Sequence, residues 1–416
     1  MHKPFLTLLS CWLFLIVSCA LSAYDVTVIG TVGHADGLAR ISVGVMDLLK
    51  DDLKINCIPT YMNLKDINND VKKIISNSKK LPGTVSFFCS PLWYSNDPYL
   101  YKKVPNSKIK IAYSMLESTS IPPEWVTILN SRFDAVVVPD HFLVEVYANS
   151  GVTIPIFELP LGMYLDDFLL RPKRQRPSYP FVFGTTVSCD ERKNFSLMIQ
   201  SFAEEFGNME GVVLKLNSRM GSAAFYEELI QSLGVSNIIF THDVLNKKQY
   251  VEFIDSFDCF INIAKGEGFS LCPREALALS IPCVLTNNSS QITICNSGVV
   301  RSVPSDILEP TNYWGLFGGQ EVGCFSTCSK EDVKTALRDV YTNYSFYLNQ
   351  AEAGPEWVSQ YCWPNLKKKY LNLIKPKNIY YGDANEITDD YFMTNSSKLY
   401  KKYKKTFNQQ KSAHKK

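Results

Sequence analysis

The chain has 416 residues, of which 46% are hydrophobic and 20% charged, a balance that excludes general disorder and predicts a packed globular core. This length allows two domains of ordinary size. A formal net charge of +2 gives no whole-protein reason to expect nucleic-acid binding. The twelve cysteines include no Cys-x2-Cys pair and the five histidines form no cluster, so we expect no metal site.

Residues 1–23 have the pattern of a targeting segment. A short positive start precedes an apolar run at 5–17, and cleavage after Ala20 or Ser22 would give a signal peptide. Two alternatives stay open. Residues 16–19 match a bacterial lipoprotein box, and the whole segment is nearly long enough for an uncleaved signal anchor. We expect a secretory or membrane-associated location, with the cytoplasmic face of a membrane as the alternative.

Short apolar runs then alternate with helix-like segments, which predicts a doubly wound α/β architecture. In the first half we expect strands at 25–30, 54–60, 83–89, 109–115, 134–139 and 155–159. In the second half we expect strands at 181–185, 211–216, 237–241, 259–264, 282–286 and 298–303. Helices are expected between the strands, for example at 194–206, 223–233 and 247–257, and a helical stretch is expected at 331–374.

A polar segment bounded by prolines separates the two halves and is typical of an interdomain linker. We therefore expect a Rossmann-like domain at 24–165, a linker at 166–180 and a second Rossmann-like domain with terminal helices at 181–375. A cleft between two such domains is the usual place for a ligand.

The chain ends in a basic tail at 376–416, with eight lysines and no acidic residue from position 391 onward. We interpret it as a solvated tail. Its interleaved basic and aromatic residues leave contact with an anionic membrane surface as the functional alternative. We expect no nucleic-acid partner.

The strongest functional signal is the run Glu267-Gly268-Phe269-Ser270-Leu271-Cys272-Pro273-Arg274-Glu275-Ala276. It follows an expected strand and opens an expected helix. The start of a helix presents N–H groups without helical partners and a positive dipole end, which suits a diphosphate. A carboxylate on each side would then accept hydrogen bonds from sugar hydroxyls.

This run resembles the donor-site signature of retaining GT-B glycosyltransferases (glycosyl transferases group 1), which is Glu-x7-Glu inside a run like Glu-Gly-Phe-Gly-Leu-Pro-x-x-Glu-Ala. The resemblance implies a GT-B fold, with two Rossmann-like domains, an interdomain cleft and a last helix that crosses back onto the first domain. It also implies transfer of a hexose from a nucleotide-diphosphate sugar with retention of configuration. It implies no metal and no other cofactor. Further matching stretches extend it over about residues 110–290.

The resemblance implies roles for residues of the second domain. Glu275 would bind the ribose and Glu267 the hydroxyls of the donor sugar, while Lys193 and Arg192 would neutralise the diphosphate. The expected donor-binding residues are Glu275, Lys193, Arg192, Gly268, Phe269, Ser270, Leu271 and Val244, and the expected catalytic residues are Glu267, Glu117 and Lys193. The sequence departs from the family at Thr185, where an arginine is usual.

Two motifs in the first domain extend the resemblance. The loop from Gly30 to Arg40 is glycine-rich and joins the first strand to a helix, as does the family loop that faces the cleft; its acceptor-side candidates are Gly33, Asp36, Gly37 and Arg40. Glu117 follows a strand, where open α/β sheets place ligand contacts, and we expect it to touch the acceptor or the donor sugar. Asp140 stands where the family usually has serine.

Other functions stay open beside a transferase acting on a glycan, lipid or protein acceptor. The targeting segment favours an exported, non-catalytic carbohydrate- or nucleotide-binding protein on the same scaffold, because nucleotide sugars are scarce outside the cytosol. A sugar-nucleotide epimerase would use the same fold, and a phosphorylase would need a phosphate site that the sequence does not show. A nicotinamide enzyme is disfavoured, since Gly30-x-x-Gly33-x-x-x-Gly37 does not fit Gly-x-Gly-x-x-Gly.

Overall fold

The computed structural model describes residues 24–33, 37–79, 82–172, 177–311, 313 and 315–374. The expected targeting segment at 1–23, the basic tail at 376–416 and Asp36 lie outside the described residues, so the expectations about them stay predictions. Within the described residues, no helix has both the length and the apolar character needed to cross a bilayer.

The first half of the chain forms a parallel six-stranded sheet in the order β2-β1-β3-β4-β5-β6. Its strands are β1 (Val26–Val32), β2 (Ile55–Met62), β3 (Val85–Cys89), β4 (Ile109–Tyr113), β5 (Ala135–Val138) and β6 (Ile156–Glu158). The helices are α2 (Gly37–Leu49), α3 (Asn69–Ser76), η1 (Leu100–Lys103), α4 (Pro123–Arg132), α5 (His141–Asn149) and α6 (Asp166–Leu169). Strands β3 and β5 are buried at every position, as expected for a parallel sheet covered on both faces.

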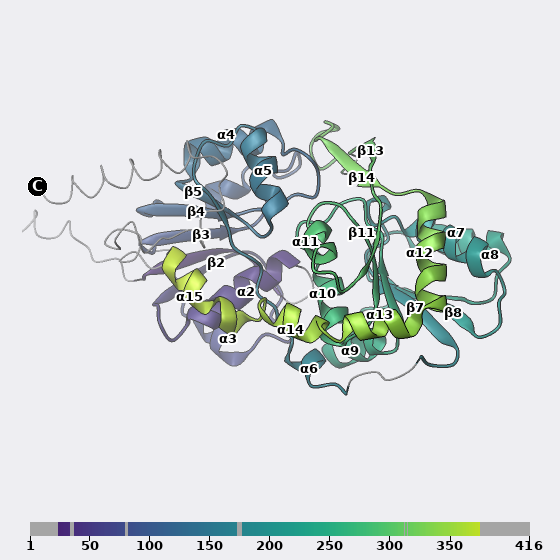
Figure 1. The fold of residues 1–416 in the computed structure, drawn as a ribbon. Coiled ribbons are helices and arrows are strands. Elements are labelled where there is room, and N and C mark those ends of the chain that lie inside the picture. Colours follow the sequence, from purple (N-terminus) through teal and green to yellow (C-terminus); the bar gives the residue numbers. More distant parts are fainter. Residues whose placement is uncertain are drawn as a thin grey trace, which may run out of the picture.

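The second half forms another parallel six-stranded sheet in the order β12-β11-β10-β7-β8-β9 (Figure 1). Its strands are β7 (Phe181–Thr186), β8 (Val212–Asn217), β9 (Ile238–Thr241), β10 (Cys259–Asn262), β11 (Cys283–Thr286) and β12 (Arg301–Val303). The helices are η2 (Glu191–Lys193), α7 (Phe195–Phe206), α8 (Ala223–Leu233), α9 (Lys247–Asp255), α10 (Leu271–Ala278), α11 (Gln291–Cys295), α12 (Lys330–Thr342) and α13 (Tyr344–Ala351). Each strand expected from the sequence is present, and the α/β architecture is confirmed.

Each sheet begins at an interior strand and is wound outward in both directions. Strand β1 lies between β2 and β3, and strand β7 lies between β8 and β10. At such a point the loops that leave the carboxyl ends of neighbouring strands diverge, and open α/β sheets bind their ligands there. In the second sheet these are the loops after β7 and after β10, which carry the expected donor-site residues.

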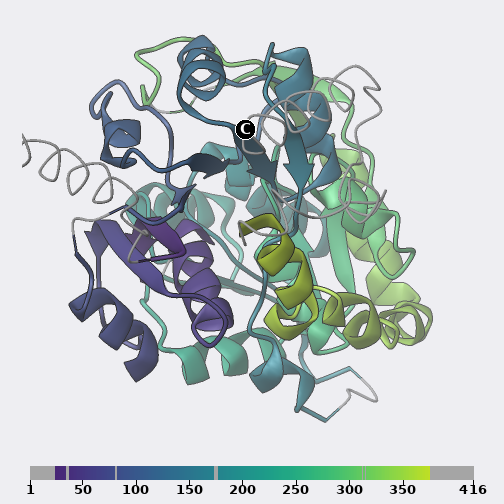
Figure 2. The same cartoon turned by 90° about the vertical axis from the view of Figure 1, so that its left-hand side faces the viewer.

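The chain returns to the first sheet at its end. After α14 (Gly354–Ser359), helix α15 (Trp363–Ile374) packs against α2, as Figures 1 and 2 show. Within the helical stretch expected at 331–374, residues 360–362 separate the last two helices, because Met163 N donates to Tyr361 O and Trp363 N donates to Met163 O. A strand-like contact thus interrupts the helix where it crosses.

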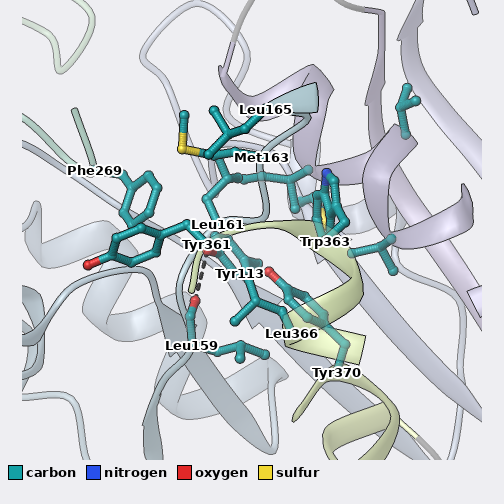
Figure 3. Packing of buried hydrophobic residues seen from close by; sticks show 14 of the residues in the cluster. Tyr113, Leu159, Leu161, Met163, Leu165, Phe269, Tyr361, Trp363, Leu366 and Tyr370 are labelled. Atoms are coloured by element: carbon teal, nitrogen blue, oxygen red, sulfur yellow. Dashed lines mark hydrogen bonds between the residues drawn. The ribbon is translucent and has the colours of Figure 1, made fainter. Parts of the chain in front are cut away.

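Two aromatic residues anchor α15 on the first domain (Figure 3). The ring of Trp363 fills space left by two glycines: a Cβ added to Gly44 or Gly162 would lie 1.9 or 2.1 Å from its ring atoms. Tyr370 lies edge-on to Phe87, with ring centroids 6.5 Å apart, and its hydroxyl donates to the backbone of the first domain, at Pro160 O, over 2.9 Å. The last helix therefore belongs to the core of the first domain.

One element has no counterpart in the sequence-based expectations. Residues 304–328, here called the interdomain strap, contain the antiparallel pair β13 (Ile307–Pro310) and β14 (Cys324–Thr327). Phe317 of the strap stacks on Trp93 of the first domain, with centroids 6.2 Å apart. Thr119 N donates to Cys324 O over 3.1 Å, and Cys324 N donates to Thr119 Oγ1 over 2.9 Å. The strap thus ties the second domain to the loop after β4.

Candidate functional site

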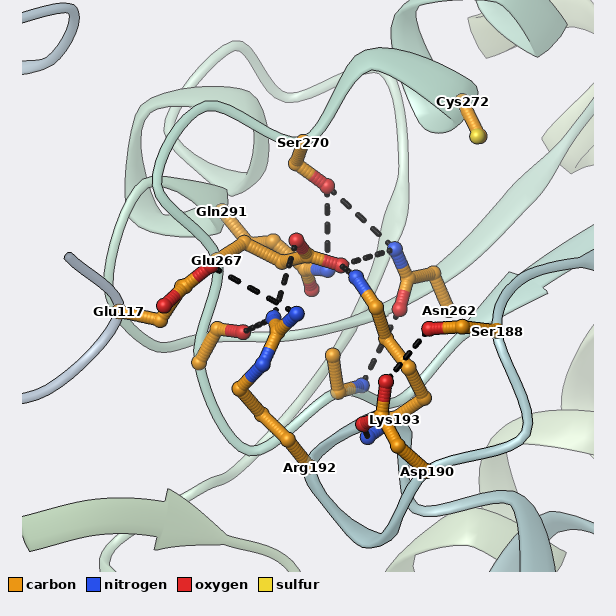
Figure 4. A network of polar contacts seen from close by, with 12 residues as sticks. Glu117, Ser188, Asp190, Arg192, Lys193, Asn262, Glu267, Ser270, Cys272 and Gln291 are labelled. Carbon is orange, nitrogen blue, oxygen red and sulfur yellow. Dashed lines mark hydrogen bonds and ion pairs between the residues drawn. The ribbon is translucent and has the colours of Figure 1, made fainter. Parts of the chain in front are cut away.

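Glu267 lies at the centre of a buried polar network at the carboxyl ends of β7 and β10 (Figure 4). Lys193 Nζ donates to its Oε1 over 2.6 Å, and Asn262 Nδ2 reaches the same oxygen over 3.2 Å. Arg192 Nη1 lies 3.5 Å from Glu267 Oε2 and donates to Gly266 O over 2.7 Å. The structure therefore brings together the expected residues Glu267, Lys193 and Arg192.

A tight turn aims the two basic side chains at this carboxylate. Asp190 Oδ1 accepts from Lys193 N over 3.1 Å and caps η2. Asn194, with φ 57°, then reverses the chain into α7, a left-handed conformation that asparagine tolerates well. Lys265 N donates to Arg192 O over 2.7 Å, so the loops after β7 and β10 are joined by their backbones.

The charges of this network set the ionisation of Glu267. Burial alone would raise the pKa of the Glu267 carboxyl, but Lys193 and Arg192 outweigh burial and hold that pKa below its ordinary value. Glu117, from the loop after β4, joins from the first domain with Oε1 3.6 Å from Arg192 Nη2. Two cations and two carboxylates therefore meet at the domain boundary and balance one another.

The start of α10 is held in an unusual backbone conformation. Ser270 has φ 61° at a position where the resembled signature has glycine. Its Oγ accepts from Asn262 Nδ2 over 3.4 Å and from Gln291 Nε2 over 3.3 Å. These two buried amides compensate for the left-handed conformation and fix the loop between Glu267 and the helix.

Glu275 lies on the other side of the start of α10 in a second cluster. Its Oε1 accepts from Arg40 Nη1 over 2.8 Å, and its Oε2 accepts from the Tyr250 hydroxyl over 2.6 Å. The sequence places Arg40 with the acceptor-side loop, whereas the structure places it on the expected ribose-binding carboxylate. Tyr250 carries no motif signal in the sequence.

The first domain packs directly on the motif loop. A Cβ at Gly266 would lie 2.2 Å from Glu117 O, and one at Gly268 would lie 2.9 Å from Met115 Sδ. Gly37 opens α2 with its Cβ position 3.6 Å from Leu271 Cδ1. At Gly266 a glycine is therefore needed because backbone from the other domain approaches closely, whereas Gly268 and Gly37 face side chains of the other domain.

The remaining expected residues lie at the edges of this site. Gly33 follows β1, and a Cβ added to it would lie 3.7 Å from Ala39 Cβ. Phe269 is buried, with its ring 4.0 Å from the guanidinium carbon of Arg274. Val244 is exposed in the loop after β9. In the described part of the chain no group of three or more His, Cys, Asp or Glu is arranged to hold a metal ion.

Comparison with known proteins places this geometry in a fold family. No protein-family model matches the sequence, and no curated protein matches it. Among solved structures, the chain is similar to WaaG, a glycosyltransferase involved in lipopolysaccharide biosynthesis (15% identity, 84% of this chain and 99% of that chain, TM-score 0.57). It is also similar to sucrose-phosphate synthase from Thermosynechococcus elongatus (12%, 84% and 98%, 0.59). A third is Anabaena HepE in complex with UDP-glucose (10%, 85% and 100%, 0.57). The chain has the GT-B fold.

Proposed function

We propose that this GT-B chain is a glycosyltransferase that transfers a hexose from a nucleotide-diphosphate sugar, with retention of anomeric configuration. The carrying observation is the network in which Lys193 and Arg192 hold the ionised Glu267 at the switch point of the second sheet. The structural likeness to WaaG and to HepE, which was solved with UDP-glucose, supports this proposal through the fold.

The diphosphate is proposed to bind between η2 and the start of α10. Lys193 and Arg192 supply two cations, and the first turn of α10 supplies backbone N–H groups without helical partners. Without a donor, Glu267 and Glu117 neutralise these cations. A diphosphate brings more negative charge than a carboxylate, so it competes for Lys193 and stabilises the leaving group as its bond to the sugar breaks.

The two glutamates of the motif are proposed to bind the two sugars of the donor through hydrogen bonds. Glu267, once Lys193 has turned to the diphosphate, accepts hydrogen bonds from hydroxyls of the transferred hexose. Glu275, eight residues further on, accepts from the ribose. Glu117 approaches Arg192 from the first domain and is proposed to hold the acceptor or the donor sugar, because its carboxylate lies 3.6 Å from Arg192 at the domain boundary.

The test is a thermal-shift series on the full chain with UDP, GDP and ADP. A ligand that binds only the folded state stabilises it by about 2.7 kcal/mol at a hundred times its Kd. We expect one nucleotide to stabilise the parent and Lys248→Ala, whose side chain is 81% exposed, but not Lys193→Ala. The matching nucleotide sugars then show transfer or hydrolysis, with the anomer assigned by NMR.

The outcomes separate the candidate functions. If none of the three nucleotides stabilises the parent, the proposal is wrong. If a nucleotide or its sugar binds but no sugar is transferred or hydrolysed, the exported binding protein expected as the alternative is favoured instead.

A further inference from the structure

Glu275 is covered in this structure. Only 3% of the residue is exposed, and each carboxylate oxygen already accepts a hydrogen bond, one from Arg40 and one from Tyr250. A ribose hydroxyl cannot reach a carboxylate that is closed to solvent. Something must therefore move before Glu275 binds a nucleotide.

The two partners of Glu275 differ in the domain they come from and in their exposure to solvent. Tyr250 belongs to the same domain, and its ring lies edge-on to Phe168 with centroids 6.4 Å apart. Its hydroxyl also lies 3.4 Å from Cys272 Sγ. Arg40 comes from the first turn of α2 in the other domain, and 29% of its side chain is exposed. Arg40 is thus a partner from the other domain whose long side chain is partly open to solvent.

Departure of Arg40 does not require the domains to separate. The first turns of α2 and α10 lie against each other at Gly37 and Leu271. The boundary is also held at other places, including the strap contact of Thr119 with Cys324. Loss of the Arg40 contact alone therefore leaves these other contacts of the boundary in place.

We propose that Arg40 occupies the ribose position on Glu275 in the unliganded protein and that a nucleotide binds by displacing it. This inference rests on the proposed function, because it requires a ribose at Glu275. Arg40 is then a specificity-determining residue. A ligand with ribose hydroxyls exchanges them for the Arg40 contact, and its apparent affinity is reduced by the fraction of protein in which Arg40 covers the carboxylate.

The test compares a ribose with a ribose that lacks its hydroxyls. Calorimetry gives the Kd of the best-binding nucleotide among UDP, GDP and ADP, and of its 2′,3′-dideoxy form, for the parent and for Arg40→Gln. We expect Arg40→Gln to bind the ribose nucleotide about fivefold or more tightly than the parent does. The dideoxy form should bind both proteins equally, because it does not compete with Arg40.

Tyr250→Phe is the matched control, since it removes the other hydrogen bond to Glu275 and leaves Arg40 in place. It should not tighten binding of the ribose nucleotide. Arg40→Lys keeps the charge but loses the planar guanidinium, so it should tighten binding of the ribose nucleotide by a smaller factor than Arg40→Gln does. It replaces Arg40→Gln in the test if that variant fails to fold.

Three results overturn the inference. Weaker binding of both nucleotides by Arg40→Gln means that Arg40 contacts the diphosphate. Equal affinities in parent and variant mean that Arg40 does not compete. If the parent binds no nucleotide, the proposed function fails and this inference fails with it, whereas the first two results leave the proposed function standing.

Discussion

Asp140 and Arg274 form a buried ion pair across the domain boundary, with Asp140 Oδ2 3.8 Å from Arg274 Nη2. Arg274 is fully buried, and its guanidinium carbon lies 4.0 and 4.7 Å from the ring centres of Phe269 and Tyr361. Asp140 replaces the serine usual in the resembled family. The pair explains this departure, because a buried cation at the start of α10 needs a counter-charge.

The Asp140–Arg274 pair makes the free energy of unfolding of the protein depend on pH. Burial raises the pKa of Asp140 to about 6, and the nearby charge of Arg274 offsets this only in part. The folded protein binds this proton more tightly than the unfolded chain, whose value is 3.8. Asp140 therefore contributes stability that is complete below the unfolded value and is lost as pH rises through the folded value.

Asp140→Asn should remove this dependence. We expect the free energy of unfolding of the variant, relative to the parent, to rise by roughly 3 kcal/mol between about pH 4 and pH 7. Urea denaturation across that range measures it, with the exposed Asp51→Asn as the control. If the free energy of unfolding of Asp140→Asn instead falls relative to that of the parent as the pH rises, the ion pair outweighs the cost of burying the carboxylate.

Gly266 and Gly268 offer a matched pair for the contact between the domains. Gly266→Ala forces a Cβ against the backbone oxygen of Glu117, which must move, whereas Gly268→Ala meets the flexible end of Met115. Displacing a site residue by about 1 Å costs about a hundredfold in rate. We expect kcat/KM for sugar transfer to fall about that far in Gly266→Ala and much less in Gly268→Ala. Equal losses would contradict a role for the position of Glu117.

Ser270 tests the strained turn before α10. Ser270→Ala keeps the left-handed conformation and leaves Asn262 and Gln291 without a shared acceptor, while Ser270→Gly loses the same acceptor but relieves the backbone. A glycine at positive φ should make Ser270→Gly more stable than Ser270→Ala by about 1 kcal/mol. Thermal unfolding of the two variants and the parent measures this, and the reverse order would argue against strain at this residue.

A substitution at Gly44 tests how α15 packs against α2. Glycine to alanine inside an exposed helix gains about 1 kcal/mol. In α2, however, the new Cβ would meet the ring of Trp363, so Gly44→Ala should cost about 1–3 kcal/mol. In a Trp363→Ala background the same change should become neutral or favourable. Urea denaturation of the parent, the two single variants and the double variant gives the free energies for this double-mutant cycle. If Gly44→Ala still costs stability in the Trp363→Ala background, the packing argument is contradicted.

Much of the fold follows from local sequence. Apolar runs such as 134–139 become buried parallel strands, since a sheet covered on both faces requires them. Lys193 and Glu267 could be assigned to one donor site from their motifs, though not to direct contact with each other. Arg192 could be assigned to the same site, but the direction of its side chain could not be predicted, because it depends on the turn that Asp190 caps and Asn194 closes.

Contacts between distant segments carry no such signal. Arg40 and Glu275 are 235 positions apart, and neither has a neighbour in sequence that indicates the other. In the strap, the buried Phe317 and Val322 are separated by glycines with positive φ, so no helical or strand period marks them. Such segments acquire their structure from the surface on which they pack.

The packing of α15 on α2 affects when the first domain can finish folding during synthesis. A ribosome releases residues 24–165 long before residues 363–374. Until then α2 lacks the helix that packs on it, and Gly44 and Gly162 lack the ring of Trp363 that packs against them. The first domain of the nascent chain therefore exposes apolar surface until α15 has been synthesised. Nascent chains stalled before position 363 should bind chaperones, and completed chains should not.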